Sequence, residues 1–273
     1  AGGPFDNSRT KLQKGSLITA IDGEKLEAGK DYFPLLNDKA GKRLLVSFRT
    51  ASGEQVDEVI RPISSSALND LLYKRWVKQR AEEVERVSKG TLGYVHIPSM
   101  GDPSFRTVYS DVMGKYYQKK GIVIDIRYNG GGRLHEDIEA FFTGKHYADQ
   151  VVRDRQYSEM SSRRWNRPSV LVTCEADYSN AHGTPWVYQH LKVGKVVGMP
   201  VAGTMTSVNW VTLLDPSVYF GIPAVGFRLF DGRYLENTQM EPDVVVPLDP
   251  TKVLQGVDTQ IEKAVEVLRA ETK

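Results

Sequence analysis

Short apolar runs alternate with helix-like stretches along most of the chain. Residues 122–126, "IVIDI", form a β-branched run that only Asp125 interrupts, which is typical of a strand covered on both faces. Further strands are predicted within 91–100, 168–174 and 193–198. Helical patterns at 103–120, at 133–142 and from 179 follow three of these strands, and 258–270 predicts a closing helix. This alternation predicts an α/β core.

The first sixty or so residues have a different pattern, which predicts a mainly-β domain. Strands are expected at 18–21, at 44–48 and up to Pro62, with tight turns at Asp22-Gly23 and Ser52-Gly53 and a helical stretch over 31–42. A long amphipathic helix then ends at Gly90. We therefore divide the chain into a domain at 1–63, a linker helix at 64–90 and a domain at 91–273. Two later segments are an arginine-rich stretch at 151–167 and a β-hairpin region at 212–237.

Composition excludes several classes of protein. With 36 basic and 34 acidic side chains the net charge is only +2, so no overall field attracts nucleic acid or an acidic membrane. No apolar stretch is long enough to span a bilayer. Cys174 is the single cysteine, which excludes an internal disulfide and a cysteine-rich metal site. We expect no metal and no cofactor.

The beginning of the chain lacks the apolar core of a signal peptide, and a strand-like segment follows almost at once. This pattern indicates a piece of a longer polypeptide. A chain with one cysteine is compatible with the periplasm and with the cytoplasm, of which we favour the periplasm.

Three glycines follow the buried strand at 122–126 and precede a helix. Gly130, Gly131 and Gly132 carry no Cβ, so their backbone can take positive φ and another molecule can approach their N–H groups. This is the geometry of an anion or oxyanion cradle, and it is equally that of an ordinary tight turn.

A second strand-to-helix junction, "EADYSNAHG" at 175–183, contains Ser179. Ligands gather at such junctions in α/β folds, and the amides of a helix N-terminus favour developing negative charge. Serine is also a preferred N-cap residue, so the local sequence supports both a nucleophile and a simple cap.

A nucleophilic serine needs a base. His96 ends a predicted strand and His135 closely follows the glycines, and spacing alone does not choose between them. His182 and His190 lie downstream on the helix that Ser179 would begin, where we expect them to face solvent or a neighbouring segment.

Five segments, in order along the chain, resemble the C-terminal half of the tricorn branch of the tail-specific serine peptidases, family S41. They are "YKRWVKQRAEEVERVSKGTLGYVHIPSMG", "GIVIDIRYNGGG", "ADYSNAHG", "GKVVGMPVAG" and "YLENTQMEPDVVV". Upstream, "GSLITAIDG" and "AGKRLLVSFR" resemble a PDZ domain, without its usual opening strand and carboxylate-binding loop. A PDZ-like domain here could bind an extended peptide or act as a spacer.

The resemblance implies a ClpP/crotonase-like α/β catalytic core preceded by a mainly-β PDZ-like domain and a linker helix. It makes Ser179 the nucleophile, His96 the base and Glu236 the acidic member. The amides of Gly131 and Asn180 become the oxyanion donors.

The implied substrate is a peptide or an unfolded protein segment, with Gly130, Gly132 and Arg133 beside it. Arg133 and the cluster Arg153, Arg155, Arg163 and Arg164 could hold a terminal carboxylate, or they could form a solvated face. The resemblance also implies a homo-oligomer of the full-length protein, with neither nucleic acid nor membrane insertion involved.

Several positions depart from the family's pattern. The Ser-Lys branch places a lysine after a glycine, but this chain has Thr204 after Gly203, and Lys195 lies within a predicted strand. Val95 replaces the serine that precedes the histidine in the tricorn branch, and Asn180 stands where an acidic residue often follows the nucleophile. Gln239-Met240 replaces the family's glycine segment. These departures keep a second hypothesis open, a catalytically inactive peptide-binding homologue. A nucleotide-binding domain is excluded, because no Lys-Ser/Thr follows the glycines.

Overall fold

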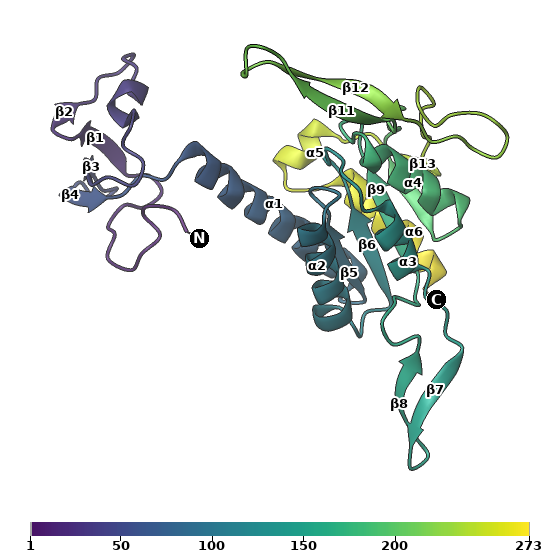
Figure 1. Ribbon diagram of the computed structural model, residues 1–273. Helices are drawn as coiled ribbons and strands as arrows, with labels where there is room; N and C mark the ends of the chain where they lie inside the picture. The colour runs from purple at the N-terminus through teal and green to yellow at the C-terminus, as the bar shows by residue number, and fades with distance from the viewer. Residues whose placement is uncertain (1, 273) are drawn as a thin grey trace. The chain divides into compact units, whose positions relative to one another are not determined.

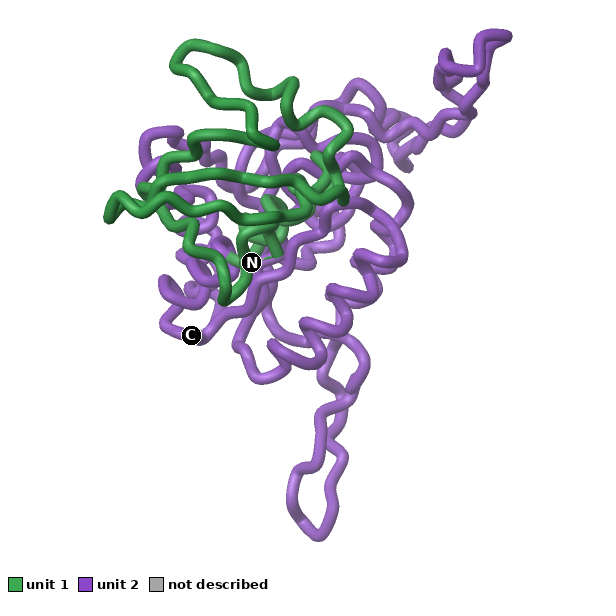
Figure 2. Tube along the Cα trace, turned by 90° about the vertical axis from the view of Figure 1, so that its left-hand side faces the viewer, with its two compact units in different colours: residues 1–78 green, residues 79–273 purple. Residues whose placement is uncertain are grey.

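The structure is a computed structural model that describes residues 2–272. The chain divides into two compact units, residues 1–78 and residues 79–273, which Figure 2 shows in different colours. The long helix α1 (Ser65–Ser88) begins in the first unit and ends in the second. None of the helices described is long and apolar enough to cross a membrane.

The first unit is a small antiparallel sheet with the strand order β2-β1-β3-β4. Its strands are β1 (Leu17–Ile21), β2 (Glu24–Lys25), β3 (Leu44–Arg49) and β4 (Gln55–Ile60). The core forms on one face because alternate residues of β3, among them Leu44, Val46 and Phe48, point inward. The helical stretch expected over 31–42 is reduced to a single 3₁₀ turn, η1 (Phe33–Leu36), which starts with Pro34 in its first turn.

The second unit is built on a five-stranded parallel sheet with the order β13-β10-β9-β6-β5 (Figure 1). Its strands are β5 (Leu92–His96), β6 (Gly121–Asp125), β9 (Ser169–Thr173), β10 (Lys195–Gly198) and β13 (Val244–Val245). Every residue of β6 and β9 is buried, as the sequence predicted for strands covered on both faces. Because all five strands run the same way, their carboxyl ends meet along one edge.

Helices cover both faces of this sheet (Figure 1). They are α2 (Asp102–Ser110), extended by one wider turn at Asp111–Lys115, α3 (His135–Phe142), α4 (Asn180–His190) and α6 (Thr259–Glu271), whereas the short helix α5 (Pro250–Leu254) is exposed along its length. α6 packs on β6, β9 and β10, while α3 packs against α4. The mixed α/β architecture expected from the sequence is therefore confirmed.

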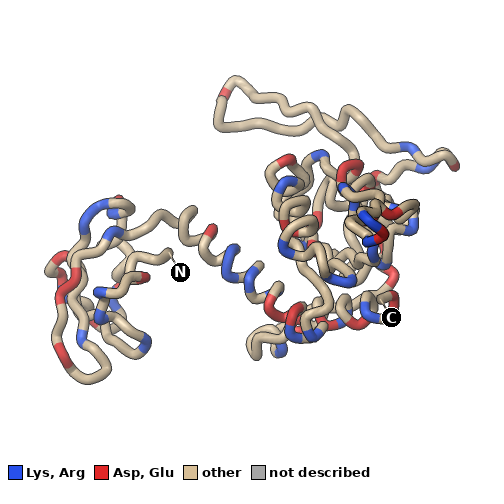
Figure 3. Tube along the Cα trace, turned by 90° about the horizontal axis from the view of Figure 1, so that it is seen from below, with Lys and Arg blue, Asp and Glu red and all other residues tan. Residues whose placement is uncertain are grey.

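Two β-hairpins project from this unit (Figure 1). β7 (Ala148–Val152) and β8 (Arg155–Met160) form the first, which begins just before the arginine-rich stretch and continues into it, where no strand was predicted. β11 (Ser207–Thr212) and β12 (Tyr219–Val225) form the second, which begins before the hairpin region expected at 212–237. Charged residues are spread over both units, but this second hairpin carries almost none (Figure 3).

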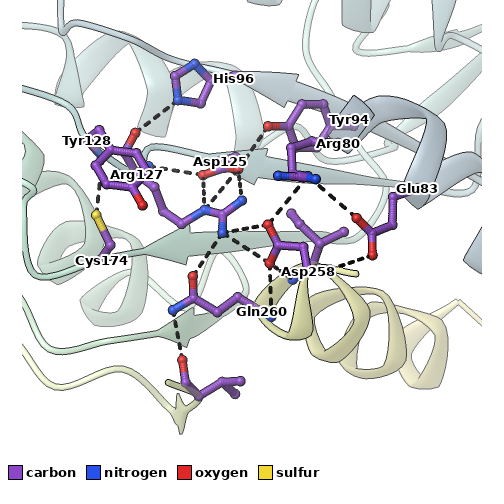
Figure 4. A network of polar contacts seen from close by, with 12 residues as sticks. Arg80, Glu83, Tyr94, His96, Asp125, Arg127, Tyr128, Cys174, Asp258 and Gln260 are labelled. Carbon is purple, nitrogen blue, oxygen red and sulfur yellow. Dashed lines mark hydrogen bonds and ion pairs between the residues drawn. The ribbon is translucent and has the colours of Figure 1, made fainter. Parts of the chain in front are cut away.

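A buried ionic network links β6 to α6 (Figure 4). The guanidinium of Arg127 donates to Asp125, with Nη2 to Oδ2 at 2.7 Å, and to Asp258, with Nη1 to Oδ2 at 2.9 Å. It also donates to Gln260 Oε1 at 2.9 Å, and Tyr94 donates its hydroxyl to Asp125. Burial alone would raise the pKa of Asp125, but the adjacent Arg127 guanidinium lowers that pKa below its usual range. Asp125 is therefore ionised beside the buried Arg127 cation, while Asp258 pairs with Arg127 and also lies 3.5 Å from Nε of the buried Arg80.

We predict that Arg127→Ala lowers the free energy of unfolding by about 3–5 kcal/mol, because it leaves Asp125 and Asp258 buried without that cation. The measurement is urea unfolding followed by circular dichroism. Arg106→Ala, which breaks the exposed Arg106–Asp102 pair, is the matched control and should change stability by less than about 1 kcal/mol. Equal effects of the two substitutions would show that the network contributes no more than a surface pair.

Candidate active site

Ser179 lies in the turn between β9 and α4, at the carboxyl edge of the sheet. Its backbone has φ 57° and ψ −120°, and its side chain makes no capping hydrogen bond to α4. The simple N-cap interpretation is therefore wrong. A positive φ at a residue with a Cβ costs on the order of 1–3 kcal/mol and needs support from its surroundings. A strained strand-to-helix turn of this kind presents a serine hydroxyl at the top of a sheet.

The glycine run packs directly against Ser179. A Cβ placed on Gly131 would lie 2.6 Å from Ser179 Cβ and 3.1 Å from its Oγ, and Gly131 has φ +96°. A Cβ on Gly132 would lie 2.1 Å from the carbonyl oxygen of Met100. Glycine is therefore required at both positions, because a Cβ would collide with neighbouring atoms and because both residues have a positive φ. The segments around 131 and 179, far apart in the sequence, form one site.

Asn129 connects this site to the strand that carries His96. Its side chain donates from Nδ2 to the carbonyl of Ile97 at 2.7 Å and accepts the N–H of Gly131 at 2.8 Å. Its own carbonyl accepts the N–H of Tyr178 at 2.9 Å. The residue is fully buried. Asn129 thus joins the glycine run to the end of β5 through its side chain and to the serine turn through its main chain.

A buried carboxyl group lies beneath the serine turn. Asp177 accepts the backbone N–H of Cys174 at 3.0 Å and that of Asn129 at 3.3 Å. Burial raises the pKa of Asp177 to about 8, although these two hydrogen bonds oppose the shift. Burial also raises the pKa of the Cys174 thiol, to about 12, so this cysteine is protonated at neutral pH.

The loop at 201–206 holds Ser179 from the other side. The hydroxyl of Thr204 accepts the N–H of Ser179 at 2.9 Å, and two residues later the N–H of Thr206 donates to Glu236 Oε2 at 2.7 Å. Glu236 is half-buried. The structure therefore places Glu236 against the loop that supports the serine, with Thr206 as the hydrogen-bond partner of its carboxylate.

His96 ends β5, and its ring Nε2 lies 3.0 Å from the carbonyl oxygen of Arg127 (Figure 4). A carbonyl only accepts, so Nε2 carries the proton and Nδ1 is left as the basic nitrogen. Burial lowers the pKa of His96, while the charge of Asp125, its partner on the adjacent strand, opposes that shift. His96 is consequently neutral at pH 7.

The other histidines have different surroundings. His135 Nδ1 lies 2.8 Å from Asn180 Nδ2, and Asn180 is itself the first residue of α4. His182 is fully buried and donates from Nε2 to the carbonyl of Thr238, whereas His190 is exposed and stacks on Trp186. Their contacts match the expectation that these two face a neighbouring segment or solvent.

The predicted basic residues do not gather at one place. Arg133 is exposed beside the glycine run, next to the exposed Gly130 and Gly132. Arg153 and Arg155 belong to the β7–β8 hairpin, and Arg163 and Arg164 precede Pro168, whose carbonyl accepts the N–H of Ile122 at the start of β6. Because this segment lies at the amino edge of the sheet, it is opposite the serine. A carboxylate clamp that includes the cluster is therefore wrong for this unit.

Lys195 is exposed at the beginning of β10 and pairs with Asp243 at 3.0 Å. It lies at the amino edge of the sheet, so it cannot serve Ser179 as a base. Among the residues described, no group of three or more His, Cys, Asp and Glu side chains is placed to hold a metal ion.

Sequence reasoning missed three residues of this site. Asn129 and Thr204 support the turns, and Asp125 lies beside His96. Asp125 could have been predicted to have a buried partner, because it is a carboxylate within an otherwise apolar strand that is covered on both faces. The hydrogen bonds of Asn129 and Thr204 depend on loops that the sequence pattern does not place.

Two family models match the chain. "Peptidase family S41" matches residues 91–246, and "Tricorn protease PDZ domain" matches residues 1–65. The first match covers more than half of the chain and includes His96, the glycine run, Ser179 and Glu236.

Individual relatives give the same result. The tricorn protease of Thermoplasma acidophilum is 27% identical over 261 residues, which are 95% of this chain and 24% of that protein. A tricorn protease homolog of Saccharolobus solfataricus is 26% identical over 97% of this chain and 24% of its own length. A crystal structure of the tricorn protease, 27% identical, superposes with a TM-score of 0.80 over 94% of this chain and 25% of that chain. The chain thus spans about a quarter of the length of these relatives.

We predict that Asp177 makes the protein less stable as the pH rises. Its folded pKa, about 8, lies above the unfolded value of 3.8, so the folded state holds a proton that the unfolded state has lost. The free energy of unfolding should therefore fall between about pH 4 and pH 8, by up to about 1.4 kcal/mol per pH unit.

Urea unfolding at a series of pH values measures this slope. Asp177→Asn should flatten it, while Asp102→Asn, at an exposed site, should leave it as in the unmodified chain. Parallel curves for Asp177→Asn and the unmodified chain would contradict the assignment of this titration to Asp177.

Proposed function

Because the chain belongs to peptidase family S41, we propose that it hydrolyses peptide bonds with Ser179 as the nucleophile. One observation carries this proposal: Ser179 has a strained positive φ, makes no capping bond and packs against a glycine that tolerates no Cβ. A serine that only capped a helix would have neither the strain nor the glycine contact.

His96 is proposed as the general base. Nε2 donates to the Arg127 carbonyl, so Nδ1 is the nitrogen that takes the proton from the Ser179 hydroxyl and later returns it to the leaving amine. The lowered pKa of His96 keeps the ring neutral and able to accept at pH 7. The imidazolium formed during the reaction is stabilised by the charge of Asp125.

Glu236 is proposed as the acidic member of the Ser-His-Glu arrangement. Its support is the hydrogen bond from Thr206, which lies on the loop that also holds the Ser179 amide through Thr204. The Arg127 carbonyl already orients His96, since it fixes which ring nitrogen carries the proton. Glu236 therefore adds negative charge and holds the loop at 201–206 in place, whereas the tautomer of His96 is set by the Arg127 carbonyl.

The amides of Asn180 and Gly131 are proposed to hold the oxyanion. Asn180 begins α4, and the first amides of a helix have no partner within it. The Gly131 amide donates to Asn129 Oδ1 at 2.8 Å, so it must exchange this bond for one to the substrate. Each donor of this kind is worth on the order of a hundredfold in rate.

The proposed substrate is a peptide or an unfolded protein segment, which enters beside the exposed Gly130, Gly132 and Arg133. Two of its relatives are a tricorn protease and a tricorn protease homolog, and the chain spans about a quarter of their length. We propose that the full-length protein forms a homo-oligomer.

The occupied Gly131 amide favours one second candidate, a peptide-binding protein without activity. In that protein Asn129 would keep its hydrogen bond to Gly131 and the oxyanion would lose a donor. Covalent labelling separates the two candidates, because only an activated serine reacts.

We predict that a fluorophosphonate probe labels Ser179 and that Ser179→Ala abolishes both the labelling and peptide hydrolysis, because the nucleophile is then absent. Intact-protein mass spectrometry and a quenched-fluorescence peptide assay make the two measurements. Ser110→Ala, at an exposed position of α2, is the control and should label normally. A chain that binds peptide but takes up no probe would establish the inactive candidate.

We further predict that Glu236→Gln retains more activity than His96→Gln. The substitution at 96 removes the base and should lower kcat by about 10²–10⁴-fold. The substitution at 236 leaves the Arg127 carbonyl in place to orient His96, so its loss should be smaller. Steady-state kinetics on one peptide compares them, and an equal loss would assign the orienting role to Glu236.

A further inference from the structure

The side chain of Asn180 is committed to the segment that follows the glycines. Its Oδ1 accepts the backbone N–H of Leu134 at 2.9 Å and that of His135 at 3.1 Å. Its Nδ2 faces His135 Nδ1 at 2.8 Å. Asn180 and Leu134 are both buried. The N-cap residue of α3 is Leu134, whose side chain cannot form a capping hydrogen bond. Asn180 of α4 instead accepts the N–H groups at the start of α3.

These contacts fix the protonation of His135. Backbone N–H groups only donate, so the atom of Asn180 that faces them must be its carbonyl oxygen. The amide nitrogen then faces His135, and because an amide NH₂ only donates, Nδ1 must present a lone pair. His135 is therefore the neutral tautomer with its proton on Nε2.

An acidic residue at position 180 could not make the same set of bonds. Its second oxygen would face Nδ1 as an acceptor, and two acceptors without a proton repel each other. The histidine would have to carry a proton on Nδ1. The asparagine after the nucleophile, where the family often has an acid, is thus matched to a neutral histidine at 135.

We propose that Asn180 is a positioning residue, which holds the glycine run against Ser179 by bonding to Leu134 and to neutral His135. The run is attached at its other end by Asn129, whose Oδ1 accepts from Gly131. Between these two asparagines the three glycines have no side chains with which to hold their own conformation. The run is also paired with Met100, whose N–H donates to the Gly131 carbonyl at 2.9 Å and whose carbonyl accepts the N–H of Arg133 at 2.6 Å. The two asparagines add the side-chain attachments that hold Gly131 beside Ser179.

The kinetic part of this inference rests on the proposed function, whereas the tautomer does not. Long-range ¹H–¹⁵N NMR of imidazole-labelled protein reports which ring nitrogen is protonated. Comparison with His135→Gln assigns the signal. In the unmodified chain His135 should show the proton on Nε2 alone, and in Asn180→Asp it should show a proton on Nδ1. A wild-type His135 with a protonated Nδ1 overturns the inference.

The rate of Ser179 labelling by a fluorophosphonate tests the positioning role. Asn180→Ala removes the attachment but keeps the backbone amide, and it should slow labelling about 10- to 100-fold. Asn180→Asp should recover most of that rate, because a carboxylate can accept from the same two amides once His135 moves its proton. Urea unfolding of both variants shows whether the fold persists.

Gln189→Ala is the matched control. Gln189 lies on the same helix and also makes two hydrogen bonds, to Glu241 and Asp243, at the end of α4 remote from Ser179. The Ser179 labelling rate of the Gln189→Ala protein should equal that of the unmodified chain. Normal labelling of a folded Asn180→Ala protein would overturn the positioning role. Absence of labelling in the unmodified chain would instead defeat the proposed function, and the NMR result would still decide the tautomer.

Discussion

The ion pairs around Arg127 are the constraint on which the second unit depends. One guanidinium, 1% exposed, lies between Asp125 of β6 and Asp258 at the start of α6, and none of the three could be buried alone at an acceptable cost. Residues 131 positions apart in the chain are joined in this way. The same arrangement holds the main chain of residue 127 where its carbonyl meets the ring of His96.

Polar side chains that reach between segments support the site. The glycine run is attached through Asn129 to the end of β5 and through Asn180 to α4, and Ser179 is attached through Thr204 to the loop after β10. Each attachment uses a buried amide or a half-buried hydroxyl with defined donors and acceptors, which makes it selective for one geometry. The strain at Ser179 persists because its neighbours hold it from two sides.

Much of the fold was predictable because the parallel strands are buried on both faces. Residues 122–126, interrupted only by Asp125, and residues 170–172 are apolar runs, and the helices between them have clear boundaries. The β7–β8 hairpin escaped prediction because β7 is exposed along its whole length and β8 is half-buried only over its last three residues, so neither strand shows a buried alternation. The helix expected at 31–42 was overestimated, since Pro34 and the turn at 37–42 limit it to one turn.

The sequence by itself determined the α/β class, the junctions after residues 126 and 174, and the residue types available for acyl-transfer chemistry. These follow from local periodicity and from glycine's lack of a Cβ, which act within a few residues. Only the tertiary structure decided that Gly131 touches Ser179, that Arg127 presents its carbonyl to His96 and that the arginine cluster lies at the opposite edge. Those outcomes depend on strand order and on hydrogen bonds between distant segments, and no local pattern encodes the distance between two loops.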